Sequence, residues 1–245
     1  MRKIFVFSAL LLIAVAFTGC RTWWQSDVDE IVANVKKKSD PQNKAESVNS
    51  AIFKYDYIND LEKGKITILL KRPGKIKVMF RVGKDFWECA FDGQRAWEYT
   101  NDKGLRFLKE KETNEVRLQA FLLLPSINIK QIFKKIRVEC SEKVGREDCW
   151  KLICHPRDDF KSQPIKVYVA KKTYLIVKAV EEQDTENEVI EVVTSFRDYR
   201  NFKGFMLPVL TITKIEDDLT ESKLVSVEIN REIPDSAFAA PEVFK

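Results

Sequence analysis

The sequence predicts an α+β protein: a strongly curved, incomplete antiparallel β-barrel of about ten strands, with an N-terminal helix and an inserted helical lid. From Ile52 onward apolar residues alternate with polar ones, which is the period of a half-buried strand. Turn pairs such as Asp92-Gly93 separate the alternating runs. Residues 115–124 interrupt the alternation with helical spacing. A sheet this large curls, and helices over its concave side would enclose an apolar cavity.

The chain begins like an exported bacterial lipoprotein. Two basic residues precede an apolar stretch over residues 4–17, and Thr18-Gly19-Cys20 follows. This order is typical of a secretory signal, and the stretch is too short to span a bilayer as a helix. The Thr-Gly-Cys motif resembles a lipobox, so we expect lipid attachment at Cys20. The alternative is an ordinary signal peptide, since Phe17 stands where a lipobox usually has Leu.

This beginning sets the predicted domain boundaries. Residues 1–19 form the signal peptide, residues 20–26 a lipidated tether and residues 27–245 a single domain. A β architecture of this size often forms one domain. Arg21 rather than Asp follows the lipidated Cys, which under the enterobacterial sorting rule indicates the outer membrane. The domain would then face the periplasm.

Local signals predict the order of the elements. Ser26 provides a capping-box-like start, and apolar residues at helical spacing continue to about Lys38. The inserted helix over residues 115–124 ends before Pro125, and residues 127–134 predict a second short helix. The predicted strands cover residues 65–71, 75–82, 87–91, 97–99, 136–140, 149–155, 165–169, 174–180, 189–198, 205–215 and 224–230.

Beyond Cys20 the chain has four cysteines, and an exported compartment permits disulfides among them. A tight turn centred on Val144-Gly145 would place Cys140 directly opposite Cys149, within bonding distance. A disulfide between these two residues is therefore one interpretation. The alternative is that all four thiols are buried and pack as small apolar groups.

Motifs for catalysis or metal binding are scarce. His155 is the single histidine, and its neighbour Cys154 points to the opposite face of the predicted strand, so the two cannot share a site. Neither a Gly-x-Ser-x-Gly elbow nor a phosphate loop is present. The 42 basic and 37 acidic residues are nearly balanced and scattered, which gives no nucleic-acid footprint. We expect no enzyme activity, metal, cofactor or nucleic-acid partner.

Apolar binding is better supported than chemistry. Aromatic residues cluster in one meander, and the segment around Phe121 and Leu122 is unusually apolar for a surface helix. If the curled sheet leaves a cavity, these residues line it, because large pockets are lined by aromatic and aliphatic groups. The competing expectation is a fully packed core. An acyl chain would bind by buried area alone, at about 25 cal/mol per Å².

Three segments resemble the LolA/LolB-like superfamily of lipoprotein carriers. Residues 71–77 read Lys-Arg-Pro-Gly-Lys-Ile-Lys, and residues 91–99 read Phe-Asp-Gly-Gln-Arg-Ala-Trp-Glu-Tyr. They are similar to the Lys-Arg-Pro strand end and to the later Asp-Gly-x-x-x-Trp-x-Tyr hairpin of these carriers. Residues 230–238 resemble the Ile-Pro-Asp-x-x-Phe ending of the wider group. The matches are short, within a resemblance that covers roughly residues 52–238.

The resemblance implies an incomplete barrel with a helical lid over a cavity for acyl chains. It implies that Arg72 lies near the mouth and bonds the lid backbone, and that Phe80 replaces an aromatic residue usual after Lys-Arg-Pro. The LolA-type carriers are soluble, whereas an anchor at Cys20 is a feature of LolB-type acceptors. The complete set of predicted ligand-binding residues is Arg72, Phe80, Trp87, Phe91, Trp97, Tyr99, Phe121 and Leu122.

Three functions remain open at this stage. The first is a membrane-anchored lipoprotein that binds the acyl chains of a lipid or lipoprotein in a hydrophobic cavity, as a carrier or acceptor in envelope trafficking. The second is an envelope sensor of RseB-like type, with a periplasmic carrier or regulator protein as its partner. The third is a structural envelope lipoprotein without a ligand. The first agrees best with the apolar meander.

Overall fold

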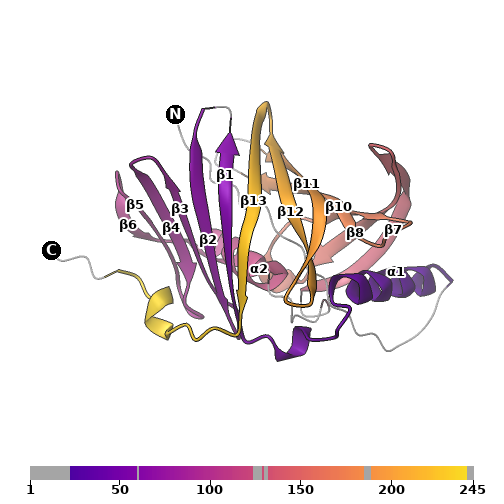
Figure 1. The fold of residues 1–245 in the computed structure, drawn as a ribbon, viewed down its shortest axis with the longest axis horizontal. Helices are drawn as coiled ribbons and strands as arrows, with labels where there is room; N and C mark the ends of the chain where they lie inside the picture. Colours follow the sequence, from indigo (N-terminus) through magenta and orange to yellow (C-terminus); the bar gives the residue numbers. More distant parts are fainter. Residues whose placement is uncertain (1–22, 60, 124–128, 130–131, 185–188, 242–245) are drawn as a thin grey trace.

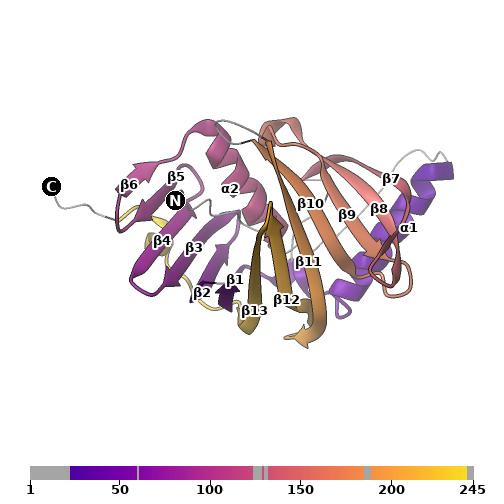
Figure 2. The same cartoon turned by 90° about the horizontal axis from the view of Figure 1, so that it is seen from above.

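The computed structural model describes residues 23–59, 61–123, 129, 132–184 and 189–241. In this part of the chain, thirteen antiparallel strands form one sheet that curls into a half-barrel without closing (Figures 1 and 2). Two α-helices accompany the sheet. The predicted fold class is therefore confirmed, with more strands than the ten or so expected.

The elements follow the chain in this order. Helix α1 spans Trp23–Ser39, and helix α2 spans Glu110–Leu123. Three short 3-10 helices are η1 (Ala45–Ser47), η3 (Asp158–Phe160) and η4 (Asp235–Phe238). The strands are β1 (Ser50–Asn59), β2 (Lys63–Lys71), β3 (Lys75–Val82), β4 (Asp85–Phe91), β5 (Ala96–Thr100), β6 (Gly104–Phe107), β7 (Phe133–Val144), β8 (Glu147–Pro156), β9 (Ile165–Ala170), β10 (Ile176–Asp184), β11 (Val189–Phe202), β12 (Phe205–Ile215) and β13 (Asp218–Ile229).

The strand order explains the shape of the sheet. It runs β6-β5-β4-β3-β2-β1-β13-β12-β11-β10-β9-β8-β7, so β6 and β7 form its two edges. Each half is a meander of sequential strands, and the β1–β13 pair joins the first half to the second. The chain therefore builds two curved walls that face each other (Figure 2).

The helices depart from their predicted limits. Helix α1 begins at Trp23, inside the segment expected to be a tether. Helix α2 begins at Glu110 because Glu112, at its third position, accepts the backbone N–H of Lys109 at 2.9 Å and caps the helix. The prediction of a second short helix over residues 127–134 is wrong at its C-terminal end, since Phe133 already belongs to β7. Most of residues 124–131 lie outside the described part of the chain.

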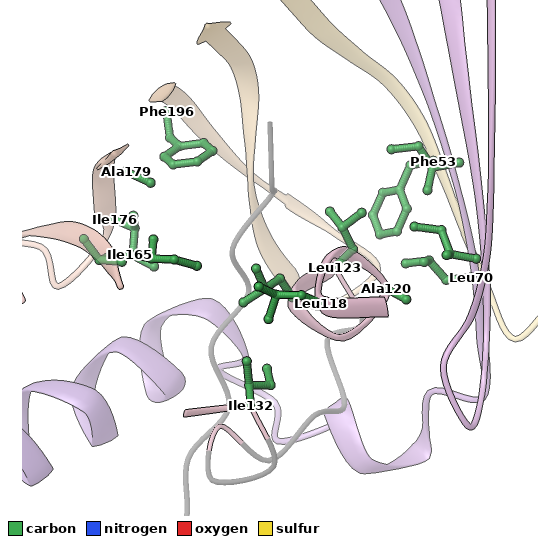
Figure 3. Close-up of a cluster of buried hydrophobic side chains, with 14 of the residues drawn as sticks. Phe53, Leu70, Leu118, Ala120, Leu123, Ile132, Ile165, Ile176, Ala179 and Phe196 are labelled. Carbon is green, nitrogen blue, oxygen red and sulfur yellow. The ribbon is translucent and has the colours of Figure 1, made fainter. Parts of the chain in front are cut away.

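The concave face of the sheet, called the inner face below, holds the main core. Phe53, Ile68, Val78 and Cys89 occupy facing positions on β1 to β4, and all are buried in one cluster. Side chains of β9 to β11 point inward from the opposite wall (Figure 3). Helix α1 adds its apolar stripe to the same cluster and packs against β7 and β12.

The outer face carries a second, smaller core that the C-terminal segment builds. Phe238 is fully buried, and its carbonyl accepts a hydrogen bond from Trp97 Nε1 at 2.9 Å. Lys71 Nζ donates to the Ile233 carbonyl at 2.8 Å and pairs with Asp235 at 2.7 Å. The lysine hydrogen bond lowers the pKa of the Asp235 carboxyl. Residues 231–238 thus strap the outer face of the first half-sheet.

We predict that Phe238→Ala lowers the free energy of unfolding by about 3–5 kcal/mol, because it empties the centre of this outer core. Urea denaturation of the protein without its signal and anchor measures the change. Leu219→Ala is the matched control, since Leu219 is 42% exposed and its truncation should have little effect. Equal stability of the two variants would contradict the role of the strap.

Candidate functional site

The candidate site is the inner face together with helix α2. This helix lies on the concave side of the sheet and packs mainly against β3, β4, β5 and η3 (Figures 2 and 3). Leu118, Ala120, Leu122 and Leu123 of α2 are buried in the same cluster as the strands. The helix therefore occupies the position expected of an inserted lid.

Three predicted aromatic residues meet on this face. Phe80 and Trp87 face each other across β3 and β4, and Phe91 lies opposite Ile76. Each of the three aromatic side chains is less than a tenth exposed. The Phe80 ring also meets Tyr57 edge to face, with centroids 4.7 Å apart. The structure thus gathers Phe80, Trp87 and Phe91 beside the apolar side of α2.

The Phe121 ring lies over the turn between β2 and β3, which contains Arg72. Gly74 in this turn has a φ of +129°, and a Cβ there would lie 3.3 Å from Phe121 Cζ. The absence of a side chain therefore lets the Phe121 ring cover the turn. The ring also packs edge to face on Phe160, with centroids 5.7 Å apart. Arg72 is half-buried in the same turn, and its bond to the lid backbone stays a prediction.

The fold resembles solved structures that share this architecture. A LolA-superfamily protein of Nitrosomonas europaea is similar with a TM-score of 0.56 at 12% identity, over 86% of this chain and 97% of that one. A Vibrio parahaemolyticus domain assigned to outer membrane lipoprotein sorting has a TM-score of 0.55 at 11% identity, over 85% and 94%. This chain has a LolA-like fold.

A third solved structure extends the comparison. A DUF1329 family protein of Desulfovibrio piger has a TM-score of 0.55 at 11% identity, over 84% of this chain and 95% of that one. At such low identity the likeness concerns the fold. No protein-family model matches the sequence, and no curated protein matches it.

Two residues predicted for the site lie on the other side of the LolA-like sheet. Phe91 pairs with Ala96, so Trp97 faces Ala90 and Tyr99 faces Glu88 on the outer face. The turn between β4 and β5 has an even number of residues, and an even turn places odd-numbered positions opposite even-numbered ones. The prediction that Trp97 and Tyr99 line the ligand site is therefore wrong. Trp97 instead serves the outer core.

The predicted pairing of Cys140 with Cys149 is wrong, because the register of the β7–β8 hairpin does not place them opposite each other. The turn of the β7–β8 hairpin is centred on Gly145-Arg146, because Val144 pairs with Glu147. Cys149 then faces Glu142, whereas Cys140 faces Lys151 after an irregularity near Val138. Cys140 is exposed, Cys149 is buried, and both thiols are free. Cys89 and Cys154 are free and buried as well, as the alternative interpretation expected.

An ion network holds the first turn of α2 to the sheet. Arg106 on β6 donates to Glu112 at 2.7 and 3.1 Å and to Glu98 of β5 at 2.5 Å. The guanidinium lowers the pKa of the Glu112 carboxyl, which also caps the helix. This arrangement was not predicted, because β6 is too short to show an alternation.

The inner face of β11 and β12 contains more polar side chains than an apolar cavity would. Thr194 and Thr213 face each other on β11 and β12, and Thr211 lies opposite Phe196. All three threonines are buried, while their apolar neighbours Leu210 and Ile212 face outward and are only partly buried. The alternation of this segment did not predict buried threonines, because its apolar residues Leu210 and Ile212 lie on the outer face.

A carboxyl group accompanies these threonines. Glu181 on β10 shares a face with Ala179, which Figure 3 shows pointing inward. Burial, followed by the charge of Glu115 on α2, raises the pKa of Glu181 to about 7. The acid therefore keeps its proton at pH values well above the usual carboxyl range and loses it as pH rises through about 7. Tyr199 donates its phenolic hydrogen to the Ile176 carbonyl at 2.6 Å on the same wall.

The described residues show neither a spanning helix nor a metal cluster. None of the described helices combines the length and apolarity that crossing a membrane requires. The same part of the chain contains no group of three His, Cys, Asp or Glu side chains placed to hold a metal ion.

We predict that one thiol of the folded domain reacts rapidly with Ellman's reagent and that the rest react only after unfolding. Cys140 is the exposed thiol, whereas burial raises the pKa of Cys89 and of Cys154 to about 12. The Cys140→Ser variant should lose the rapid reaction. The absence of any rapid thiol in the wild type would instead indicate that Cys140 is bonded.

Glu181 should make stability fall as pH rises. Its folded-state pKa lies above the usual carboxyl value, so its stabilising proton is fully present below about pH 4.5 and is lost as pH rises through about 7. The loss amounts to at most about 3 kcal/mol. Urea denaturation at pH 5 and pH 8 measures it. Glu181→Gln should remove this component, whereas Glu182→Gln, on the opposite face, should keep it.

Proposed function

We propose that this chain is a lipid-anchored protein of the cell envelope whose inner face binds the acyl chains of a lipid or a lipoprotein. The observation that carries the proposal is the gathering of Phe80, Trp87 and Phe91 on the concave face of an unclosed sheet, under a helix. The LolA-like fold supports it, because similar structures include a domain assigned to lipoprotein sorting.

Hydrocarbon burial supplies enough free energy for such binding. Each CH₂ group taken out of water contributes about 0.8 kcal/mol, so one acyl chain can bind without any polar contact. The aromatic cluster is nearly buried, so a chain reaches it only by displacing the groups that cover it. Helix α2 is one such cover. Arg106 holds its first turn to the sheet, so an entering chain would displace side chains of its C-terminal half, where Leu122 and Leu123 are buried.

The anchoring belongs to the same proposal. Residues 1–19 act as the signal peptide, Cys20 carries the lipid, residues 20–26 lead from the membrane and residues 27–245 form the domain. All of the signal peptide and Cys20 itself lie outside the described residues. The outer membrane is the proposed location, with the domain facing the periplasm. A periplasmic carrier or regulator protein is the proposed partner for transfer, and catalysis plays no part.

We expect lipid to co-purify with the domain. Protein that lacks residues 1–20 is purified from a bacterial host without detergent and examined by native mass spectrometry. Bound species should have the masses of fatty acids, phospholipids or other acyl lipids. A protein that carries no lipid, and that also fails to take up added lipid after delipidation, would refute the proposal.

The tryptophans report where the chains lie. Brominated acyl chains quench nearby indole fluorescence, and Trp87 is on the inner face whereas Trp97 is on the outer face. Trp87→Phe should therefore remove much of the quenching. Trp97→Phe is the matched control and should leave the quenched signal intact. The reverse result would place the chains on the outer face.

A further inference from the structure

Side chains with hydroxyl groups line up across the inner face where β1, β13, β12 and β11 run side by side. The strand register joins them into two neighbouring rows. Thr211 in one row pairs with Phe196, and Thr194 in the other pairs with Ala179. Both partners belong to the inner core cluster (Figure 3). The two rows, called the hydroxyl track below, are Tyr57-Ser222-Thr211 and Thr220-Thr213-Thr194.

The hydroxyl track leads from the rim of the sheet into the interior. Thr220 and Ser222 follow the exposed turn between β12 and β13, and both are half-buried. Thr211 and Thr213 on the neighbouring strand are only 3% and 6% exposed. A polar surface therefore continues from the solvent into a region where most side chains are apolar.

The hydroxyl track touches the aromatic cluster at Tyr57. The Tyr57 ring packs edge to face on Phe80, with centroids 4.7 Å apart. Tyr55, two residues earlier on β1, lies in the same row of the sheet as Phe80 and Trp87. The polar end of a molecule whose chain lies on the aromatic cluster is therefore next to the hydroxyl track.

Two buried hydroxyls at this junction have no hydrogen-bond partner in the described part of the chain. They are the Tyr55 hydroxyl and Thr211 Oγ1, and both residues are 3% exposed. Buried polar groups nearly always have a partner, so the two hydroxyls indicate one that is missing. Strand β13 separates their strands, which places β1 and β12 about 10 Å apart. A partner for both must therefore carry more than one polar atom.

We propose that the hydroxyl track and Tyr55 bind the head group of the lipid whose chain lies on the aromatic cluster, and that this head group bears several hydroxyls, as a glyceryl or glycosyl group does. The inference rests on the proposed function. A hydroxyl both donates and accepts, so the side chains of the track match the hydroxyls of such a group in either direction. An ester carbonyl of the lipid accepts from Tyr55.

The test compares two ligands with the same brominated acyl chain, its glyceryl monoester and its methyl ester. Both contain the ester carbonyl, but only the glyceryl ester has hydroxyls. Burial of apolar area alone favours the methyl ester, because it is the more apolar of the two. We expect quenching of tryptophan fluorescence in the delipidated domain to show at least about tenfold tighter binding of the glyceryl ester. A glycosyl ester of the same acid is the third ligand, and the tighter of the two hydroxyl-bearing ligands identifies the head group.

The outcomes separate this inference from the proposed function. Equal affinities for the glyceryl and methyl esters, or tighter binding of the methyl ester, would overturn the head-group site while leaving acyl binding intact. Failure of all the esters to bind would overturn the proposed function as well.

Substitution of Thr211 tests the hydroxyl track directly. Thr211→Val should reduce the preference for the glyceryl ester to about threefold, without lowering the midpoint of urea denaturation, because this hydroxyl has no partner in the described protein. Thr211→Ser retains the hydroxyl and should retain the preference. Thr67→Val is the matched control, since Thr67 lies opposite Lys54 on the outer face of β2. A Thr211→Val variant with the full tenfold preference would overturn the assignment of Thr211.

Tyr55→Phe removes the second hydroxyl and keeps the ring. Combined with Thr211→Val, it should abolish the preference for the glyceryl ester and leave the affinity for the methyl ester unchanged. An equal loss of affinity for both esters would show that the two hydroxyls only maintain the fold, and it would overturn their role in head-group binding.

Discussion

The inner face of an unclosed sheet has to be covered, and most of this structure follows from that requirement. A closed barrel covers its own inner face with strands, but here β6 and β7 remain separate edges. The two walls face each other, and buried side chains from both belong to one core cluster. Helix α2 lies between them, and α1 packs against the second wall, so the helices replace the missing strand contacts.

The outer face of this LolA-like sheet also has apolar side chains that need to be covered, and the C-terminal segment covers them. The C-terminal strap buries Trp97, Ile52 and Phe238 on the convex side of the first half-sheet. Near Ile52 of β1 and Trp97 of β5 the sheet is therefore buried on both faces, although antiparallel sheets often leave one face to water. This double burial stiffens the first wall, against which α2 packs. The second wall lacks this strap and carries the polar residues of the inner face.

The parts of the fold that depend on local pattern were predictable. Strand β12 has the predicted limits of 205–215, and the alternation of β3 and β4 gave the correct inner residues. What failed depends on how one strand is joined to the next. An even-length turn moved Trp97 to the outer face, and a turn displaced by one residue separated Cys140 from Cys149. The periodicity of a single strand does not reveal the length or the centre of the turn that follows it, so neither shift was predictable from it.

The threonines show a deeper limit of pattern analysis. Leu210 and Ile212 alternate with Thr211 and Thr213, so hydrophobicity alone assigns the apolar pair to the interior. The structure buries the hydroxyl pair instead, because the inner face of this wall contains polar groups such as Glu181 as well as hydrocarbon. A purely apolar interior would stabilise the fold more, as desolvating these groups opposes folding.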